Sequence, residues 1–316
     1  MSLPEDKILG VIVGNAIGDA LGLATEFMTQ QEAYASYPKG VQIYSDIVRD
    51  KHRSRWKIGD WTDDTDQMLC ILDCILELRE VSITCTAEKL YDWFRKDGMG
   101  IGKHTYDVLR LPEYTKYPHK ASYLIWNLSK RQSAPNGGIM RTSVLGCFRY
   151  WDWQQVRAHC EDICKITHYD PRCVASCVIV GYIISQELLG KSVMKSDIVA
   201  LASEYDVRVA DYIELSYQPD LSLLQLDDMK TCGYTLKTLS AALWAYNHCE
   251  NFADTLQCII MAGGDADTNG AVAGALMGVK LGFNAIPRKW VDGLIHGDIL
   301  IEKAQTLIEL NKQEMA

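Results

Sequence analysis

Two short clusters of carboxylate and hydroxyl side chains, far apart in the chain, have the residue types needed for metal chemistry. The first is Thr62-Asp63-Asp64 and the second is Asp265-x-Asp267-Thr268. Carboxylate and hydroxyl oxygens are hard ligands, which suit Mg²⁺, Mn²⁺ or Ca²⁺ better than Zn²⁺. The second cluster resembles a calcium loop, but no glutamate follows where an EF-hand requires one. Each cluster is therefore a candidate site for a divalent cation of another kind.

Both clusters precede a helical pattern, so helix capping is the alternative interpretation. A threonine or aspartate at a helix start accepts hydrogen bonds from free backbone amides and suits the helix dipole. One residue would be enough for that purpose, whereas adjacent carboxylates repel each other. Four aspartates and two threonines at two helix N-termini could instead hold two cations about 3.5–4 Å apart. The residue types and their spacing favour a binuclear hydrolase.

The elements that position these clusters are predicted to be helices. Nearly all apolar patterns have a helical period, as in Met68, Leu72 and Ile75, and alternating strand patterns are nearly absent. Two helices carry a glycine every four residues, at positions 10, 14, 18 and 22 and at positions 270, 274, 278 and 282. Glycine inside a helix costs about 1 kcal/mol relative to alanine, so such ridges indicate close backbone packing. We predict an all-α fold, a compact array of helices with the metal site at its centre.

Composition limits the class of protein. The 316 residues have 48% hydrophobic and 23% charged residues, with no linker-like or low-complexity segment, which predicts one domain over 1–316. The net charge of −9 argues against direct nucleic-acid binding. No apolar run reaches the ~20 residues of a membrane span, and no signal peptide is recognisable. The eleven cysteines lack C-x-x-C spacing, so we expect packed, reduced thiols in a cytoplasmic protein.

Several motifs together resemble those of the ADP-ribosylglycohydrolase family, and the likeness extends almost from end to end. They comprise Gly14–Gly22 with Glu26, Trp61–Thr65, Gly98–Gly102, Asn136–Arg141, Thr167-His168, Gly233–Thr235, Gly263–Gly270 and Ile286-Pro287 with Trp290. The resemblance implies the orthogonal helical fold of this family, with two Mg²⁺ or Mn²⁺ ions. It also implies hydrolysis of the bond between an acceptor and C1 of the distal ribose of ADP-ribose.

Matching the motifs residue by residue implies roles for individual side chains. The metal ligands would be Thr62, Asp63, Asp64, Asp265, Asp267 and Thr268, and the catalytic residues would be Glu26, Asp64 and Asp267. Glu26 matches the mobile acidic residue of the family, although it could be only an exposed glutamate. A carboxylate near two cations stays ionised, which suits a base or a ligand better than an acid.

Substrate contacts are expected from the remaining motifs. The glycine loop, with Gly98, Gly100, Ile101 and Gly102, precedes a helix expected to start near Thr105, and its amides could bind the diphosphate. A plain flexible turn is the alternative. The ribose and adenosine side would be lined by Ser133, Asn136, Gly137, Gly138, Met140 and His168. His168 is two positions before Asp170 and could equally have only a local structural role.

The acceptor is less well defined by the sequence. Ala134 and Pro135 stand where some relatives have an aromatic residue and a glycine, so a ring that stacks on adenine must come from elsewhere. We expect the partner to be a mono-ADP-ribosylated protein, with arginine ahead of serine as the modified side chain. Asp97 lies near the position of an arginine-facing carboxylate without matching it cleanly. Hydrolysis of O-acyl-ADP-ribose or another small conjugate, a non-catalytic ADP-ribose-binding role and a binuclear phosphoesterase are the alternatives, and the oligomeric state is not predicted.

Overall fold

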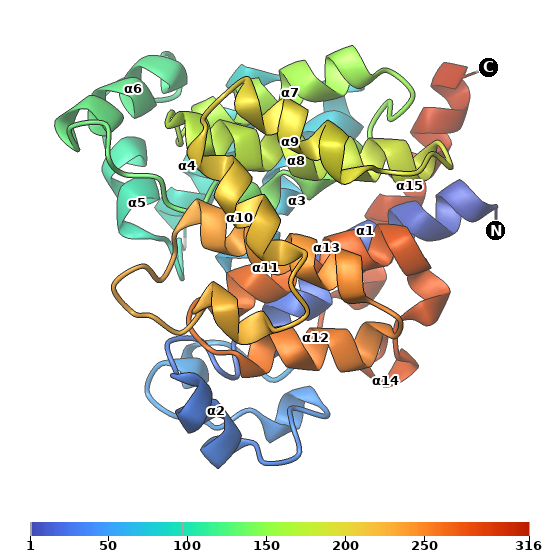
Figure 1. The fold of residues 1–316 in the computed structure, drawn as a ribbon. Helices are drawn as coiled ribbons and strands as arrows, with labels where there is room; N and C mark the ends of the chain where they lie inside the picture. Colours follow the sequence, from blue (N-terminus) through green and yellow to red (C-terminus); the bar gives the residue numbers. More distant parts are fainter. Residues whose placement is uncertain (1, 97, 316) are drawn as a thin grey trace.

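The computed structural model describes residues 2–96 and 98–315. These residues form helices joined by loops and turns, and they contain no β-strand, only one isolated bridge between Pro135 and Tyr234. The predicted all-α fold is therefore confirmed. The two described ends of the chain lie on the same side of the molecule (Figure 1).

The α-helices are α1 (Leu3–Gly22), α2 (Gln30–Ser36), α3 (Asp63–Leu78), α4 (Ile83–Lys96), α5 (Lys103–Leu109), α6 (Pro118–Leu128), α7 (Trp153–Lys165), α8 (Pro171–Leu188), α9 (Lys195–Ser203), α10 (Arg208–Ser216), α11 (Thr235–His248), α12 (Phe252–Met261), α13 (Ala266–Leu281), α14 (Arg288–Val291) and α15 (Gly297–Met315). Short 3₁₀ helices are η1 (Tyr44–Asp46), η2 (Arg53–Arg55), η3 (Ile139–Arg141), η4 (Ser143–Gly146), η5 (Leu221–Leu224) and η6 (Phe283–Ala285). Helix α5 begins at Lys103, two residues before the expected start near Thr105.

Helices α1 and α13 form the centre of the fold. They are buried on all sides, α1 from Lys7 to Gly22 and α13 from Ala266 to Val279. A surface helix would bury only one stripe, so burial all round marks the two as core helices. Figure 1 shows them packed inside the molecule, with α5 and α6 at its periphery.

The glycine ridges of α1 and α13 face each other in antiparallel register. Gly10 lies opposite Gly278, Gly14 opposite Gly274, and Gly18 opposite Gly270. A Cβ atom on Gly18 would lie 1.9 Å from the backbone oxygen of Gly270, so the two helix backbones are in direct contact. The prediction of close packing is confirmed. Gly282 is the C-cap of α13 with a φ of +85°, and its carbonyl carbon lies 3.0 Å from a Cβ atom built on Gly10.

The antiparallel contact places the C-terminal end of α1 beside the N-terminal end of α13. A Cβ atom on Gly22, the last residue of α1, would lie 2.3 Å from the oxygen of Ala266, the first residue of α13. The C-terminal end of α1 therefore adjoins the second predicted metal cluster. The turn that follows α1 carries Glu26, which enters the same region.

One expectation about the cysteines is wrong. Cys74 on α3 forms a disulfide with Cys85 on α4, with a Cα–Cα distance of 6.0 Å. The sequence argument considered only cysteines four residues apart within one helix, whereas this pair joins two consecutive helices. Cys160, Cys164, Cys173 and Cys177 are free and buried, as expected for packed thiols. Among the described residues, no helix is both long enough and apolar enough to cross a membrane.

Candidate active site

The N-terminus of α3 is bound to α1 by one buried carboxylate. Asp19 Oδ1 accepts hydrogen bonds from the backbone nitrogen (2.9 Å) and the hydroxyl (2.7 Å) of Thr62, and Oδ2 accepts from the nitrogen (3.0 Å) and the hydroxyl (2.6 Å) of Thr65. Asp19 thus satisfies free amides at the start of α3, the role that a capping side chain normally plays. Thr62 itself makes no capping hydrogen bond within α3. Its side chain is therefore available to the cluster.

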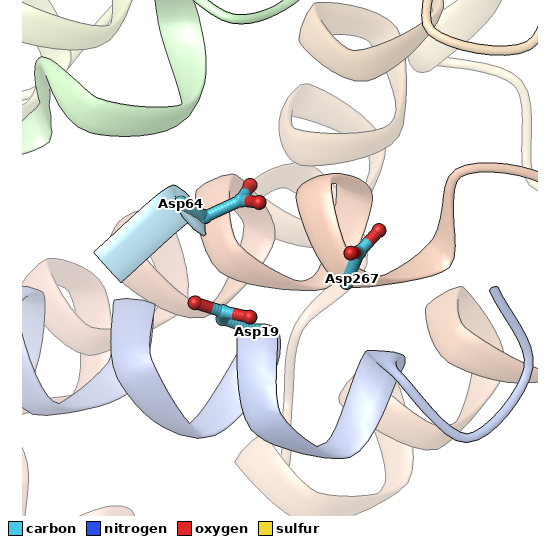
Figure 2. A group of neighbouring side chains, drawn as sticks. All are labelled: Asp19, Asp64 and Asp267. Carbon is cyan, nitrogen blue, oxygen red and sulfur yellow. The ribbon is translucent and has the colours of Figure 1, made fainter. Parts of the chain in front are cut away.

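Three helices bring carboxylates together at this point. Asp19 of α1, Asp64 of α3 and Asp267 of α13 each place an oxygen within 4.8 Å of the others. Figure 2 shows these three side chains side by side near the ends of their helices. Glu26, Asp265 and Asp267 form a second such group. Because Asp267 belongs to both, the two groups are contiguous. The two predicted metal motifs therefore meet, although they are about 200 residues apart in sequence.

The oxygens of the first group are crowded. Thr62 Oγ1 lies 3.2 Å from Asp64 Oδ2 and 3.5 Å from Asp267 Oδ2, while its proton is directed at Asp19. The lone pairs of Thr62 consequently face two carboxylates. Asp64 Oδ1 is buried and has no hydrogen-bond partner among the described residues. Buried polar oxygens are normally paired, so this arrangement fits a bound cation.

The other predicted ligands have protein partners as well as access to a cavity. Asp63 Oδ2 accepts a hydrogen bond from Gln67 Nε2 (3.0 Å), and Asp265 Oδ2 accepts one from Asn136 Nδ2 (2.6 Å). Thr268 lines the main cavity, and its backbone nitrogen donates to Asp267 Oδ1 (2.8 Å). Amide groups that donate to one oxygen of a carboxylate orient its second oxygen, as in the outer shell of many metal sites.

The protonation of the cluster depends on burial and on like charges. Burial and neighbouring carboxylates raise the pKa values of Asp63, Asp64 and Asp267 well above their usual range. Burial raises the pKa of Asp19 to about 7, and burial with the charge of Glu26 raises the pKa of Asp265 to about 6. A divalent cation would reverse both effects, because it favours the ionised form of every carboxylate around it.

Glu26 is held by the loop that precedes α3. Its Oε2 pairs with His52 Nε2 at 2.6 Å, and its backbone oxygen accepts a hydrogen bond from Arg53 (2.6 Å). Arg53 also donates to the oxygen of Ala24 (2.7 Å) and pairs with Asp50 (2.5 Å). The loop therefore fixes the turn after α1 on two sides, and the other carboxylate oxygen of Glu26, Oε1, makes no hydrogen bond with any described residue.

A cavity of about 660 Å³ opens onto the carboxylates. That volume is in the range of small-molecule sites. Thirteen predicted site residues line it: Glu26, Asp63, Asp64, Gly100, Gly102, Ser133, Asn136, Gly137, Met140, His168, Asp265, Asp267 and Thr268. Gly98 and Ile101 line an adjoining cavity of about 300 Å³, which also touches Glu26 and Asp267.

Two predicted residues contact neither cavity. Thr62 lies behind the carboxylates, where it still reaches the first oxygen group, and Gly138 packs against Cys164, His168 and Cys177. A Cβ atom on Gly138 would lie 3.0 Å from the Cys164 sulfur, which indicates a packing role rather than a contact with substrate. Asp97, the carboxylate weighed above as a guanidinium partner, lies outside the described residues.

Sequence reasoning missed Asp19, which belongs to the first oxygen group, and several residues that line the cavity. Asp19 stood inside the quoted Gly14–Gly22 motif, and a charged residue within a glycine-ridged core helix was the available signal. The outer part of the main cavity is lined by His104, Ile125 and Leu128. The His104 and His168 rings lie 4.9 Å apart. No sequence pattern singled out His104, Ile125 or Leu128.

Comparison with known proteins agrees with the fold. The family model described as ADP-ribosylglycohydrolase matches residues 1–315, so the chain belongs to the ADP-ribosylglycohydrolase family. A solved structure described as an ADP-ribosylglycohydrolase-related protein complex aligns with a TM-score of 0.76 at 23% identity, covering 98% of this chain and 100% of that one. This likeness supports the fold.

Named relatives span nearly the whole chain. An ADP-ribosylarginine hydrolase, Tri1, of Serratia proteamaculans is 27% identical over 98% of this chain and 81% of its own length. An ADP-ribosyl-[dinitrogen reductase] glycohydrolase of Rhodospirillum rubrum is 26% identical over 95% and 92%. The ADP-ribosylhydrolase ARH3 of Gallus gallus is 21% identical over 99% and 95%. The chain is accordingly a hydrolase, an ADP-ribosyl glycohydrolase.

Proposed function

We propose that this protein removes mono-ADP-ribose from modified protein side chains, with arginine as the first candidate acceptor and serine as the second. The support for arginine is the name of the Serratia relative, an ADP-ribosylarginine hydrolase. The acidic walls of the two cavities also suit a cationic leaving group. We further propose that two Mg²⁺ or Mn²⁺ ions are required.

The observation that carries the metal proposal is the crowding around Thr62. Its hydroxyl has one proton, which Asp19 accepts, yet two more carboxylate oxygens lie within 3.5 Å. In their ionised form these oxygens repel one another unless a cation lies among them, and the orphaned Asp64 Oδ1 adds to that repulsion. In the proposal, Thr62, Asp63, Asp64, Asp265, Asp267 and Thr268 hold the cations. Bound there, divalent cations would supply Lewis acidity to a water molecule and to sugar hydroxyls.

Side chains and backbone amides of the protein accept the proton and bind the nucleotide. Because His52 occupies Oε2 of Glu26, Oε1 is the oxygen that takes the proton of the attacking water as the bond from water to C1 of the ribose forms and the bond between C1 and the acceptor breaks. The acceptor leaves with the bonding electrons and receives a proton in return, so the products are free ADP-ribose and the unmodified side chain. The cavity orients the nucleotide, with its ribose end at the carboxylates and its adenosine end toward His104 and Leu128. In the Gly98–Gly102 loop, where Gly98 and Gly100 have positive φ values, the amides of Gly98 and Ile101 donate to backbone oxygens of the protein. The amides of Gly100 and Gly102 are therefore the ones that bind the diphosphate in this proposal.

The decisive measurement is release of free ADP-ribose from arginine-modified and serine-modified proteins, each assayed with Mg²⁺, with Mn²⁺ and with EDTA. Cation-dependent release from one substrate supports the reaction and identifies the acceptor. O-acyl-ADP-ribose serves as a third substrate. If it alone is hydrolysed, the proposed protein acceptor is wrong while the glycohydrolase class stands. Activity retained in EDTA after exhaustive dialysis would exclude the metal proposal.

A further inference from the structure

His168 lines the main cavity and has a buried ring nitrogen without a hydrogen-bond partner. The side chain is 1% exposed, and its Nε2 makes no hydrogen bond with any described residue. The Cε1–Nε2 edge of the ring lies against Gly137, where a Cβ atom would be 2.8 Å from Cε1 and 3.0 Å from Nε2. Both residues line the cavity. A buried nitrogen without a partner beside a cavity indicates that a ligand atom supplies the missing hydrogen bond.

The neighbouring hydrogen bonds determine which nitrogen of His168 carries the proton. Arg141 donates through Nη2 to the Thr167 hydroxyl, and a guanidinium can only donate. Among the described residues, His168 Nδ1, 2.7 Å away, is the only acceptor within hydrogen-bond distance of the Thr167 hydroxyl, so the hydroxyl directs its own proton to that nitrogen. Since Nδ1 accepts, the ring proton of the neutral histidine is on Nε2. Burial, His104 and Arg141 all lower the pKa of His168, which keeps the ring neutral.

The same chain of hydrogen bonds continues to a predicted metal ligand. Arg141 Nη1 donates to Gln67 Oε1 (2.7 Å), which leaves Gln67 Nε2 to donate to Asp63 Oδ2 (3.0 Å). Gln67, Arg141 and Thr167 are fully buried. Each donor and acceptor assignment follows from the one before, because the guanidinium has no acceptor atom. A single buried network therefore joins the carboxylate cluster to the opposite wall of the cavity.

We infer that Arg141, Thr167 and Gln67 are positioning residues that hold His168 as an Nε2–H donor for a diphosphate oxygen of the nucleotide. A phosphate oxygen can only accept, so it requires this tautomer, whereas a ribose hydroxyl would tolerate either one. The inference rests on the proposed function in one respect, namely that the cavity binds ADP-ribose. The tautomer itself does not depend on any activity.

The first test is the tautomer in the ligand-free protein. Two-bond ¹H–¹⁵N correlation spectra of ¹⁵N-histidine-labelled protein, with Mg²⁺ and with EDTA, distinguish Nε2–H from Nδ1–H, and His168→Gln assigns the signal among the seven histidines. We expect the Nε2–H form alone in the wild type and in Thr167→Ser. In Thr167→Val, which lacks the hydroxyl, we expect a mixture of tautomers. An Nδ1–H form in the wild type would overturn the inference.

The second test is binding of ADP-ribose by calorimetry. The amide nitrogen of glutamine can replace Nε2, whereas that of asparagine is placed near Nδ1. We expect His168→Gln to bind ADP-ribose at least about tenfold more tightly than His168→Asn, and Thr167→Ser at least about tenfold more tightly than Thr167→Val. Equal affinities within each pair would refute the donor role. If no ADP-ribose is released from any substrate while these differences hold, the proposed function fails and the inference stands.

Discussion

Asp267 is the carboxylate on which the site depends most, because both oxygen groups include it. Asp267→Asn removes one charge at nearly constant shape. We expect kcat to fall by about a thousandfold or more, which corresponds to about 4 kcal/mol of activation barrier. Cation affinity, measured by calorimetry, should fall as well. Asp254→Asn, at an exposed position on α12, is the matched control and should leave both quantities unchanged. Full activity in Asp267→Asn would remove this residue from the site.

His52 acts on Glu26 rather than on substrate in this arrangement. His52→Phe keeps an aromatic ring between Phe27 and Trp56 but removes the 2.6 Å contact with Glu26. We expect kcat to fall by about ten- to hundredfold, as for a misplaced general base, with little change in KM. His52→Gln, which retains a donor, should recover part of the loss. A change in KM alone would show that His52 contacts the substrate instead.

For individual residues, the sequence revealed which side chains could bind a metal but not which residues those side chains contact. Thr62, Asp63, Asp64, Asp265, Asp267 and Thr268 were recognisable because each cluster is contiguous in the chain. Asp19 was not assigned, since its four hydrogen bonds go to residues more than forty positions away. The pairing of Glu26 with His52 likewise follows from the path of a loop that carries no periodic pattern. The disulfide between Cys74 and Cys85 depends on how two helices pack, which spacing within one helix does not show.

Among the elements, the pair α1 and α13 determines the geometry of the site. A mid-helix Gly→Ala exchange normally stabilises a helix by about 1 kcal/mol. Gly18→Ala should do the opposite, because its Cβ would lie 1.9 Å from the Gly270 oxygen, a backbone atom that cannot move independently. We expect the free energy of unfolding, measured in urea, to fall by about 3 kcal/mol or more.

The control for this exchange is Gly102→Ala, where a Cβ would meet no atom within 4 Å and φ is −67°. Because Gly102 is the N-cap of α5, where alanine is less favourable than glycine, the free energy of unfolding should fall by no more than about 1 kcal/mol. A Gly18→Ala protein as stable as the wild type would mean that the helices are farther apart than described here.

The glycine spacing predicted which helices are buried in the core, but not how these helices pack against each other. Glycine every four residues identified two core helices, since nothing else explains so much lost helix propensity. Their antiparallel register, which places Gly22 beside Ala266, is a tertiary contact and was not predictable from either ridge alone. For the same reason, the sequence did not show that His104 on α5 and Leu128 on α6 would line the cavity. The prediction of a single domain over 1–316 stays a prediction.

For the whole molecule, pH and divalent cations should act on stability together. Burial raises the pKa of Asp19 to about 7, and burial with Glu26 raises that of Asp265 to about 6, whereas both are about 3.9 in an unfolded chain. At pH values between the pKa of an unfolded aspartate and the raised pKa values in the folded protein, the folded protein binds more protons than the unfolded one. The free energy of unfolding of the cation-free protein should therefore fall as pH rises from about 4 to 7 and stay low above that.

Cations should reverse this trend, because they bind the ionised carboxylates and compete with protons. At a hundredfold excess over Kd, a single site adds about 2.7 kcal/mol to the free energy of unfolding. We expect the rise in Tm on adding Mg²⁺ or Mn²⁺ to EDTA-treated protein to be larger at pH 8 than at pH 5. In Asp267→Asn, both the decline with pH and the response to cations should shrink. A rise in Tm that is equal at the two pH values would show that the cations bind away from these carboxylates.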